Sequence, residues 1–134
     1  MIECEAKLST PDPETAGLRM RCLVIDDEKD TATVLTHHLK RLGFETTVAG
    51  SGEVATRYLH DEAWDLVIVD VVLPDVDGRD LLPLIRGIES RPEVILTSVL
   101  SAGDLVDHHA DALLSKPFRG NDVVTAVQSA RKAA

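Results

Sequence analysis

Four short apolar runs alternate with longer amphipathic stretches along the chain. The runs occupy residues 23–25, 66–69, 94–96 and 112–114, and a fifth strand is expected over the mixed segment 44–48. Apolar runs of this length, bounded by turn-forming residues, are typical of strands that are buried on both faces, as in parallel sheets. The pattern therefore predicts five strands.

Apolar residues also recur at helical spacing between these runs, which predicts amphipathic helices covering the sheet. Gly43 is expected to stop the first helix, and Ser51 is a candidate N-cap of the second. The third helix is expected to begin near Asp80, so that Pro83 falls in a first turn that tolerates proline. The apolar stripes are Val34, Leu35, Leu39 and Leu42 in the first helix, Val54, Ala55, Tyr58 and Leu59 in the second, and Leu81, Leu84, Ile85 and Ile88 in the third.

The alternation of strand and helix predicts an α/β fold with a doubly wound, five-stranded parallel sheet. In such sheets ligands bind just outside the carboxyl ends of the strands. Four of the predicted strands end in residues suited to phosphate or metal chemistry, namely the adjacent Asp26 and Asp27, then Asp70, Thr97 and Lys116.

Taken alone, Asp70 is as compatible with a simple turn residue at the end of a strand as with a functional residue. Three carboxylates in one crevice, however, repel one another unless a cation lies among them or one acid is protonated. We therefore interpret Asp26, Asp27 and Asp70 as a magnesium site.

The motifs in combination resemble the receiver domains of two-component response regulators. They are VIDDE, VDVVLPDVDG, LTS and KPF, and the likeness extends in order over residues 20–133. It implies the flavodoxin-like receiver fold, with strand order 2-1-3-4-5. This order makes the first and third strands neighbours at the topological switch point.

The resemblance also implies roles for the site residues. Asp70 matches the phosphoryl acceptor, and Asp27 and Asp70 match direct magnesium ligands. Asp26 would act through a metal-bound water, and the backbone carbonyl of Val72 would complete the protein ligands.

Thr97 matches the hydroxyl that follows the phosphoryl group, and Lys116 matches the ammonium that pairs with it. The implied function is a signalling switch that takes a phosphoryl group from a sensor histidine kinase or histidine phosphotransfer protein onto Asp70 and signals by contact with a downstream protein. Such a protein catalyses only its own phosphorylation and self-dephosphorylation, and is not an enzyme acting on outside substrates. Self-dephosphorylation is expected to be slow, because Val72 and Val99 beside the water path are aliphatic and cannot orient water.

Composition limits the classes of partner and the compartment that we expect for this chain. A formal net charge of -9 argues against nucleic acid, whose phosphates require clustered Lys and Arg. Two cysteines, Cys4 and Cys22, are too few for a disulfide framework, so a reducing cytoplasm is expected. No apolar segment reaches the roughly 18 residues of a membrane-spanning helix. A homodimer is compatible with the sequence.

Proline, serine and threonine without lasting periodicity predict a mobile N-terminal arm over residues 1–20, followed by the receiver domain at 21–134. The chain ends after the fifth helix, so we expect no attached output domain. Two departures from the receiver pattern stand out. Leu113 occupies the place of the usual switch aromatic, and the short span between Thr97 and Lys116 predicts a shortened fourth helix near residues 104–109.

Two alternative functions follow from these departures and from the shared chemistry. The first is a degenerate receiver that binds proteins without being phosphorylated, although all five polar site residues are retained. The second is a magnesium-dependent phosphatase with an aspartyl-phosphate intermediate. Phosphatases of the haloacid dehalogenase type carry a second Asp two residues after the nucleophile, where this chain has Val72.

Overall fold

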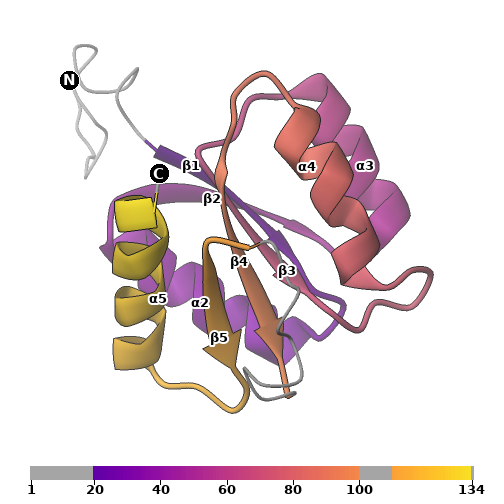
Figure 1. The fold of residues 1–134 in the computed structure, drawn as a ribbon. Coiled ribbons are helices and arrows are strands. Elements are labelled where there is room, and N and C mark those ends of the chain that lie inside the picture. Colours follow the sequence, from indigo (N-terminus) through magenta and orange to yellow (C-terminus); the bar gives the residue numbers. More distant parts are fainter. Residues whose placement is uncertain (1–19, 100–109, 134) are drawn as a thin grey trace, which may run out of the picture.

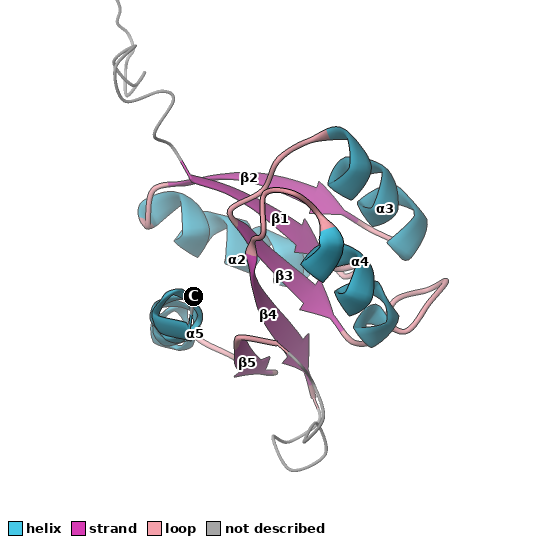
Figure 2. Cartoon of the chain, turned by 45° about the horizontal axis from the view of Figure 1, so that its top comes forward, coloured by secondary structure: helices cyan, strands magenta, loops and turns pink. Residues whose placement is uncertain are grey.

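A five-stranded parallel sheet forms the middle layer of the molecule, with helices packed on both faces (Figure 1; Figure 2). The computed structural model describes residues 20–99 and 110–133. Labels follow Figure 1. The elements in chain order are β1 (Met20–Ile25), α2 (Lys29–Arg41), β2 (Phe44–Ala49), α3 (Gly52–Asp61), β3 (Leu66–Asp70), the 3-10 helix η1 (Gly78–Leu81), α4 (Leu82–Gly87), β4 (Glu93–Ser98), β5 (Ala112–Ser115) and α5 (Gly120–Ala133).

The strand order is β2-β1-β3-β4-β5, and every pairing is parallel, which confirms the predicted fold class. All five carboxyl ends therefore lie at one edge of the sheet. The register places Asp70 at the end of β3 directly beside Thr97 on β4. The amide of Val71 donates to the Thr97 carbonyl oxygen at 3.0 Å, so this pairing continues past the end of β3.

Alternate side chains of the strands enter two separate cores, because successive residues of a strand point to opposite faces. Leu23, Val67 and Leu96 pack beneath α3 and α4. Val24 and Ile68 pack beneath α2 and α5. Figure 2 shows these two helix pairs on opposite sides of the sheet. A strand covered on both faces can be apolar throughout, which explains why all five residues of β3 are buried.

The predicted helix boundaries hold at two positions. The side chain of Ser51 accepts a hydrogen bond from Val54 N at 3.2 Å, as expected for an N-cap. Helix α2 ends at Arg41, and Gly43 has a φ of 96°, a left-handed conformation that glycine adopts without strain.

The third predicted helix differs in form from the expectation. It opens as the 3-10 turn η1 and continues as the six-residue α4, and Ile88 is already extended. Pro83 lies at the start of α4, where its missing N–H leaves no bond unmade. Ile88 still packs against the core, which is why its position fits the apolar stripe although it lies outside the helix.

Several predictions fall on residues that the structure does not describe. The shortened fourth helix near 104–109 and all but the last residue of the arm at 1–20 are among them. No helix among the described residues is long and apolar enough to cross a membrane. Cys22 is completely buried in β1, where it packs as a small apolar residue.

Candidate functional site at the carboxyl edge of the sheet

Three carboxylates meet where β1 and β3 end. Asp26 and Asp27 follow β1, Asp70 ends β3, and each acid offers an oxygen within 4.8 Å of the oxygens of the other two. Asp26 and Asp70 are only 3% and 6% exposed, whereas Asp27 is open to solvent. A donor set made only of oxygen suits a hard divalent cation such as magnesium. The predicted cluster is thus brought together by the fold.

Lys116 extends from the loop after β5 into this cluster. Its Nζ lies 3.0 Å from Asp70 Oδ2 and 3.3 Å from Asp26 Oδ2. The backbone of Lys116 is held in place, because Lys116 N donates to the Ser98 carbonyl oxygen at 2.8 Å. One ammonium therefore serves two buried carboxylates.

The charges of the cluster do not balance. Burial raises the pKa of the Asp26 carboxyl, and the nearby Asp70 raises it further, although a hydrogen bond from Glu28 N and the Lys116 ammonium oppose the shift. For Lys116, burial opposes the charged form, but the hydrogen bond to Asp70 and the charges of Asp26 and Asp70 together outweigh burial and raise its pKa. The surplus negative charge fits the binding of a cation.

Thr97 contributes a buried hydroxyl beside Asp70. The residue is 1% exposed, and its Oγ1 has no hydrogen-bond partner within the described residues. An orphaned hydroxyl in a folded protein requires a specific explanation. Here its position on the strand next to the acid cluster makes it available to a group that binds at Asp70.

The loop after β3 holds Val72 close to the acids. Val72 N donates to Asp70 Oδ1 at 3.4 Å, and an isolated antiparallel bridge joins Val72 to Asp77. Gly78 N donates to the Val71 carbonyl oxygen at 2.7 Å. A Cβ at Gly78 would lie 1.9 Å from the Asp70 carbonyl oxygen, so only glycine fits there. The Val72 backbone thus lies beside Asp70, and the role of its carbonyl as a metal ligand stays a prediction.

Sequence reasoning did not single out Asp75 in the same loop. Its carboxylate binds the first turn of α3, more than twenty residues earlier in the chain. The sequence carries only a weak indication, an Asp after Pro74, which is typical of any turn. Leu113, the predicted departure from the receiver pattern, is half-buried and packs against the core under α3 and α4.

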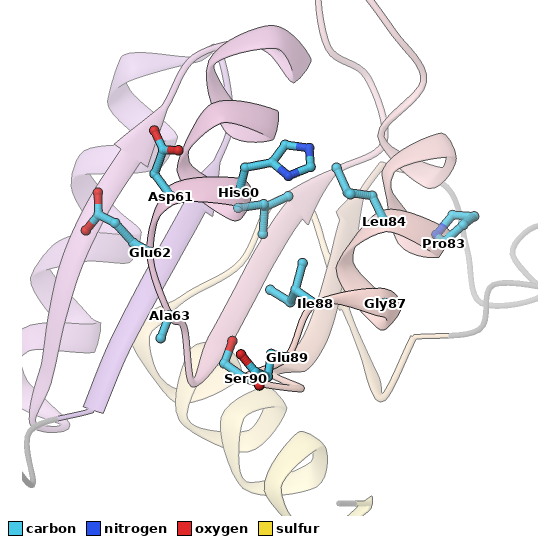
Figure 3. Close-up of a pocket in the computed structure, with 11 residues that line it drawn as sticks. His60, Asp61, Glu62, Ala63, Pro83, Leu84, Gly87, Ile88, Glu89 and Ser90 are labelled. Atoms are coloured by element: carbon cyan, nitrogen blue, oxygen red, sulfur yellow. The ribbon is translucent and has the colours of Figure 1, made fainter.

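A hollow of about 740 Å³ lies away from this chemistry. It opens between the end of α3 and α4 (Figure 3). Its lining is mixed, with Leu84 and Ile88 beside His60, Glu89 and Ser90. None of the three clustered acids borders it.

Comparison with known proteins places the chain in a family. The model of the response regulator receiver domain matches residues 22–128. The parallel sheet, the acids at its carboxyl edge and this match together define the class. The chain belongs to the response regulator receiver domains, the phosphorylation-dependent signalling domains of two-component systems.

The curated relatives include longer proteins. The chain is 37% identical over 112 residues to the DNA-binding transcriptional regulator NtrC of Azospirillum brasilense, covering 81% of this chain and 23% of that protein. It is 34% identical over 115 residues to the DNA-binding response regulator MtrA of Mycobacterium tuberculosis, covering 84% of this chain and 50% of that protein. The chain thus spans about half the length, or less, of these relatives.

Solved structures agree on the fold. The activated receiver domain of DrrB from Thermotoga maritima, solved with BeF3, has a TM-score of 0.74 and is 26% identical. That match covers 84% of this chain and 97% of the DrrB domain.

Proposed function

We propose that this chain is a signalling switch that accepts a phosphoryl group on Asp70 from a sensor histidine kinase or a histidine phosphotransfer protein. The observation that carries the proposal is the position of Lys116 Nζ, 3.0 Å from Asp70 Oδ2 within the acid cluster. This arrangement sets a carboxylate nucleophile beside a fixed positive charge. Phosphoryl transfer depends mainly on such positioning and electrostatics.

Each side chain has one task in the transfer. An Asp70 oxygen attacks phosphorus, the bond from phosphorus to the donor's histidine nitrogen breaks, and its electron pair stays on that nitrogen. No separate base is needed, because an ionised carboxylate already has free lone pairs. Lys116 then pairs with an oxygen of the bound phosphoryl group, and the Thr97 hydroxyl gains the partner that it lacks.

Magnesium would be held by Asp26, Asp27, Asp70 and the Val72 carbonyl. Bound magnesium would supply positive charge that neutralises the oxygens of the phosphoryl group during transfer. Asp27 and Asp70 would bind it directly, and Asp26 through a water. The oxygen donor set and the surplus of negative charge support this assignment.

The donor is proposed to be a protein because an apolar patch borders the site. A hollow of about 450 Å³ next to Lys116 is lined by Val34, Val99, Pro117 and Phe118, with Glu28, Asp30 and Thr31 also on its wall. Val34 is 41% exposed and Val99 is 75% exposed. Exposed aliphatic groups beside a charged site suit the docking of a second protein surface.

We propose that the output is also protein contact, and that the chain works in the cytoplasm without binding nucleic acid itself. Support comes from the net charge of -9. Val72, two residues after Asp70, cannot act as a general acid, which speaks against turnover of outside substrates.

Intact mass spectrometry after incubation with acetyl phosphate tests the acceptor. We expect addition of one phosphoryl group, dependent on magnesium and absent in Asp70→Asn. Asp80→Asn, an exposed acid in η1, is the matched control and should be modified like the wild type. Persistence of the added mass in Asp70→Asn would overturn the assignment. Lack of modification in the wild type would favour the degenerate receiver.

A protein donor tests the docking patch. With a sensor kinase that phosphorylates the wild type, Val34→Asp should slow transfer about tenfold, as expected for loss of about 1.4 kcal/mol of binding. Acetyl phosphate should modify this variant at the wild-type rate. Leu42→Asp changes an equally exposed residue, 40% exposed, at the C-cap of α2 and should leave both rates unchanged.

A further inference from the structure

The carboxylate of Asp75 links the loop after β3 to helix α3. Its Oδ1 accepts a hydrogen bond from Gly52 N at 2.8 Å, and its Oδ2 accepts one from Glu53 N at 2.9 Å. The partners are 23 and 22 residues apart in sequence. Both oxygens of one side chain are thus used on two successive amides of another element.

Asp75 and Ser51 share the capping of α3. The first amides of a helix have no partner within it. Ser51 Oγ accepts from Val54 N, and the Ser51 carbonyl oxygen accepts from Ala55 N at 3.0 Å. Asp75 serves the two amides before them. The local cap is therefore incomplete, and a residue of the β3 loop completes it.

The loop and the helix approach so closely that the contact needs a glycine. A Cβ at Gly52 would lie 2.5 Å from Val76 Cγ2 and 3.3 Å from Asp75 Oδ1. The hydrogen bond from Gly52, followed by that from Glu53, holds the pKa of the Asp75 carboxyl below its ordinary value. Asp75 thus stays ionised, and a negative charge at a helix N-terminus is favourable.

The base of the same loop is fixed beside Asp70. Gly78 N bonds the Val71 carbonyl oxygen, and Val72 bridges to Asp77. The tip, between these fixed positions, is anchored by Asp75. The Val72 backbone therefore belongs to a loop that is held at both ends.

We infer that Asp75 is a positioning residue for the metal site, which fixes the loop carrying the Val72 carbonyl by anchoring its tip to the first turn of α3. The inference rests on the proposed function, because Val72 matters only if the site binds magnesium. A ligand already held in place loses less conformational freedom when the metal binds, so affinity rises. Because coupling is reciprocal, metal binding in turn stabilises the first turn of α3.

Calorimetric titration with magnesium separates this role from simple helix capping. Asp75→Ala should weaken magnesium binding about tenfold, the low end of what loss of a group supporting a metal ligand produces. Ser51→Ala removes another cap of the same helix without removing the anchor of the loop, so its magnesium affinity should fall much less than that of Asp75→Ala. Asp75→Asn keeps one acceptor oxygen and should fall between wild type and Asp75→Ala.

Amide hydrogen exchange tests the reverse direction. Magnesium should slow exchange at Gly52 and Glu53 in the wild type, and this slowing should be lost in Asp75→Ala. Equal magnesium affinities of wild type and Asp75→Ala, or equal weakening by Ser51→Ala, would overturn the inference alone. A wild-type protein that binds no magnesium would overturn the proposed function, and this inference with it.

Discussion

Lys116 and Asp70 form an ion pair of 3.0 Å across the carboxyl edge of the sheet, although 46 residues separate them in sequence. The lysine arrives from the loop after β5 and the aspartate ends β3, with β4 between these strands. The pair therefore forms only when β3, β4 and β5 have come together. It ties the chemistry of the site to the assembly of the fold.

Removal of the ammonium should lower the stability of the metal-free protein. Lys116→Ala leaves the buried Asp26 and Asp70 without their cation, so we expect the free energy of unfolding to fall by about 1–3 kcal/mol at neutral pH. Urea unfolding followed by circular dichroism measures this. Lys132→Ala, on the exposed side of α5, should change the value by less than about 0.5 kcal/mol. Equal losses in the two variants would contradict the prediction.

Asp26→Asn should stabilise the metal-free protein in a pH-dependent way. The pKa of Asp26 is raised in the folded state, chiefly by burial, so the folded protein holds this proton more tightly than the unfolded chain. Stability therefore falls as pH rises from the ordinary Asp value of about 3.9 through the raised pKa. The Asn variant has no charge to bury and keeps an oxygen for Glu28 N.

Unfolding curves with chelator at several pH values should show the gain of Asp26→Asn at pH 7 and its disappearance below about pH 3.9. Magnesium should remove the advantage at pH 7, because it stabilises the wild type more. A gain independent of pH would contradict the argument.

Thr97→Val should separate stability from switching. Valine has nearly the same shape and removes a buried hydroxyl that lacks a partner, so we expect the free energy of unfolding to rise by about 1 kcal/mol. The difference between the free and beryllofluoride-bound forms, measured by amide exchange, should shrink, because the hydroxyl no longer binds the phosphoryl mimic. Wild-type exchange differences in the variant would count against Thr97 as the switch residue.

The lifetime of the phosphorylated form should depend on Val72 and Val99. Both are exposed, 69% and 75%, and neither can position a water for attack on phosphorus. The double variant Val72→Asn with Val99→Glu should speed decay by up to about a hundredfold. Val48→Asn, another exposed valine, on β2, is the control. Unchanged decay in the double variant, at unchanged magnesium affinity, would exclude this role.

The fold was predictable because a sheet covered on both faces imposes a simple pattern of apolar residues on the sequence. Strands buried on both sides are continuously apolar, and the helices that cover them carry one apolar stripe. The spacing of apolar residues is therefore enough to recognise β3 as a strand and α3 as a helix. The end of the third helix was not predictable in this way. Ile88 fits the helical stripe and packs in the core, but its backbone is extended, and spacing cannot distinguish these cases.

The acids and Lys116 were predictable because parallel strands deliver their carboxyl ends to one edge. Asp75 was not predictable, because its partners are backbone amides. Every residue except proline has such an amide. Nothing in the sequence therefore identifies Gly52 or Glu53 as the partner of a distant carboxylate. Likewise, only the structure gives the distances which show that the Lys116 ammonium pairs with both Asp70 and Asp26.

The chain contains one tryptophan, Trp64, which is 1% exposed just before β3. Its indole Nε1 donates to the Tyr58 carbonyl oxygen at 3.0 Å, and the guanidinium of Arg21 lies 4.5 Å from its ring centre. Six residues of extended chain, about 20 Å, separate it from Asp70. Intrinsic fluorescence will therefore report loss of the core and remain nearly silent when a cation binds, so unfolding can be followed at any magnesium concentration without interference from occupancy of the acid cluster.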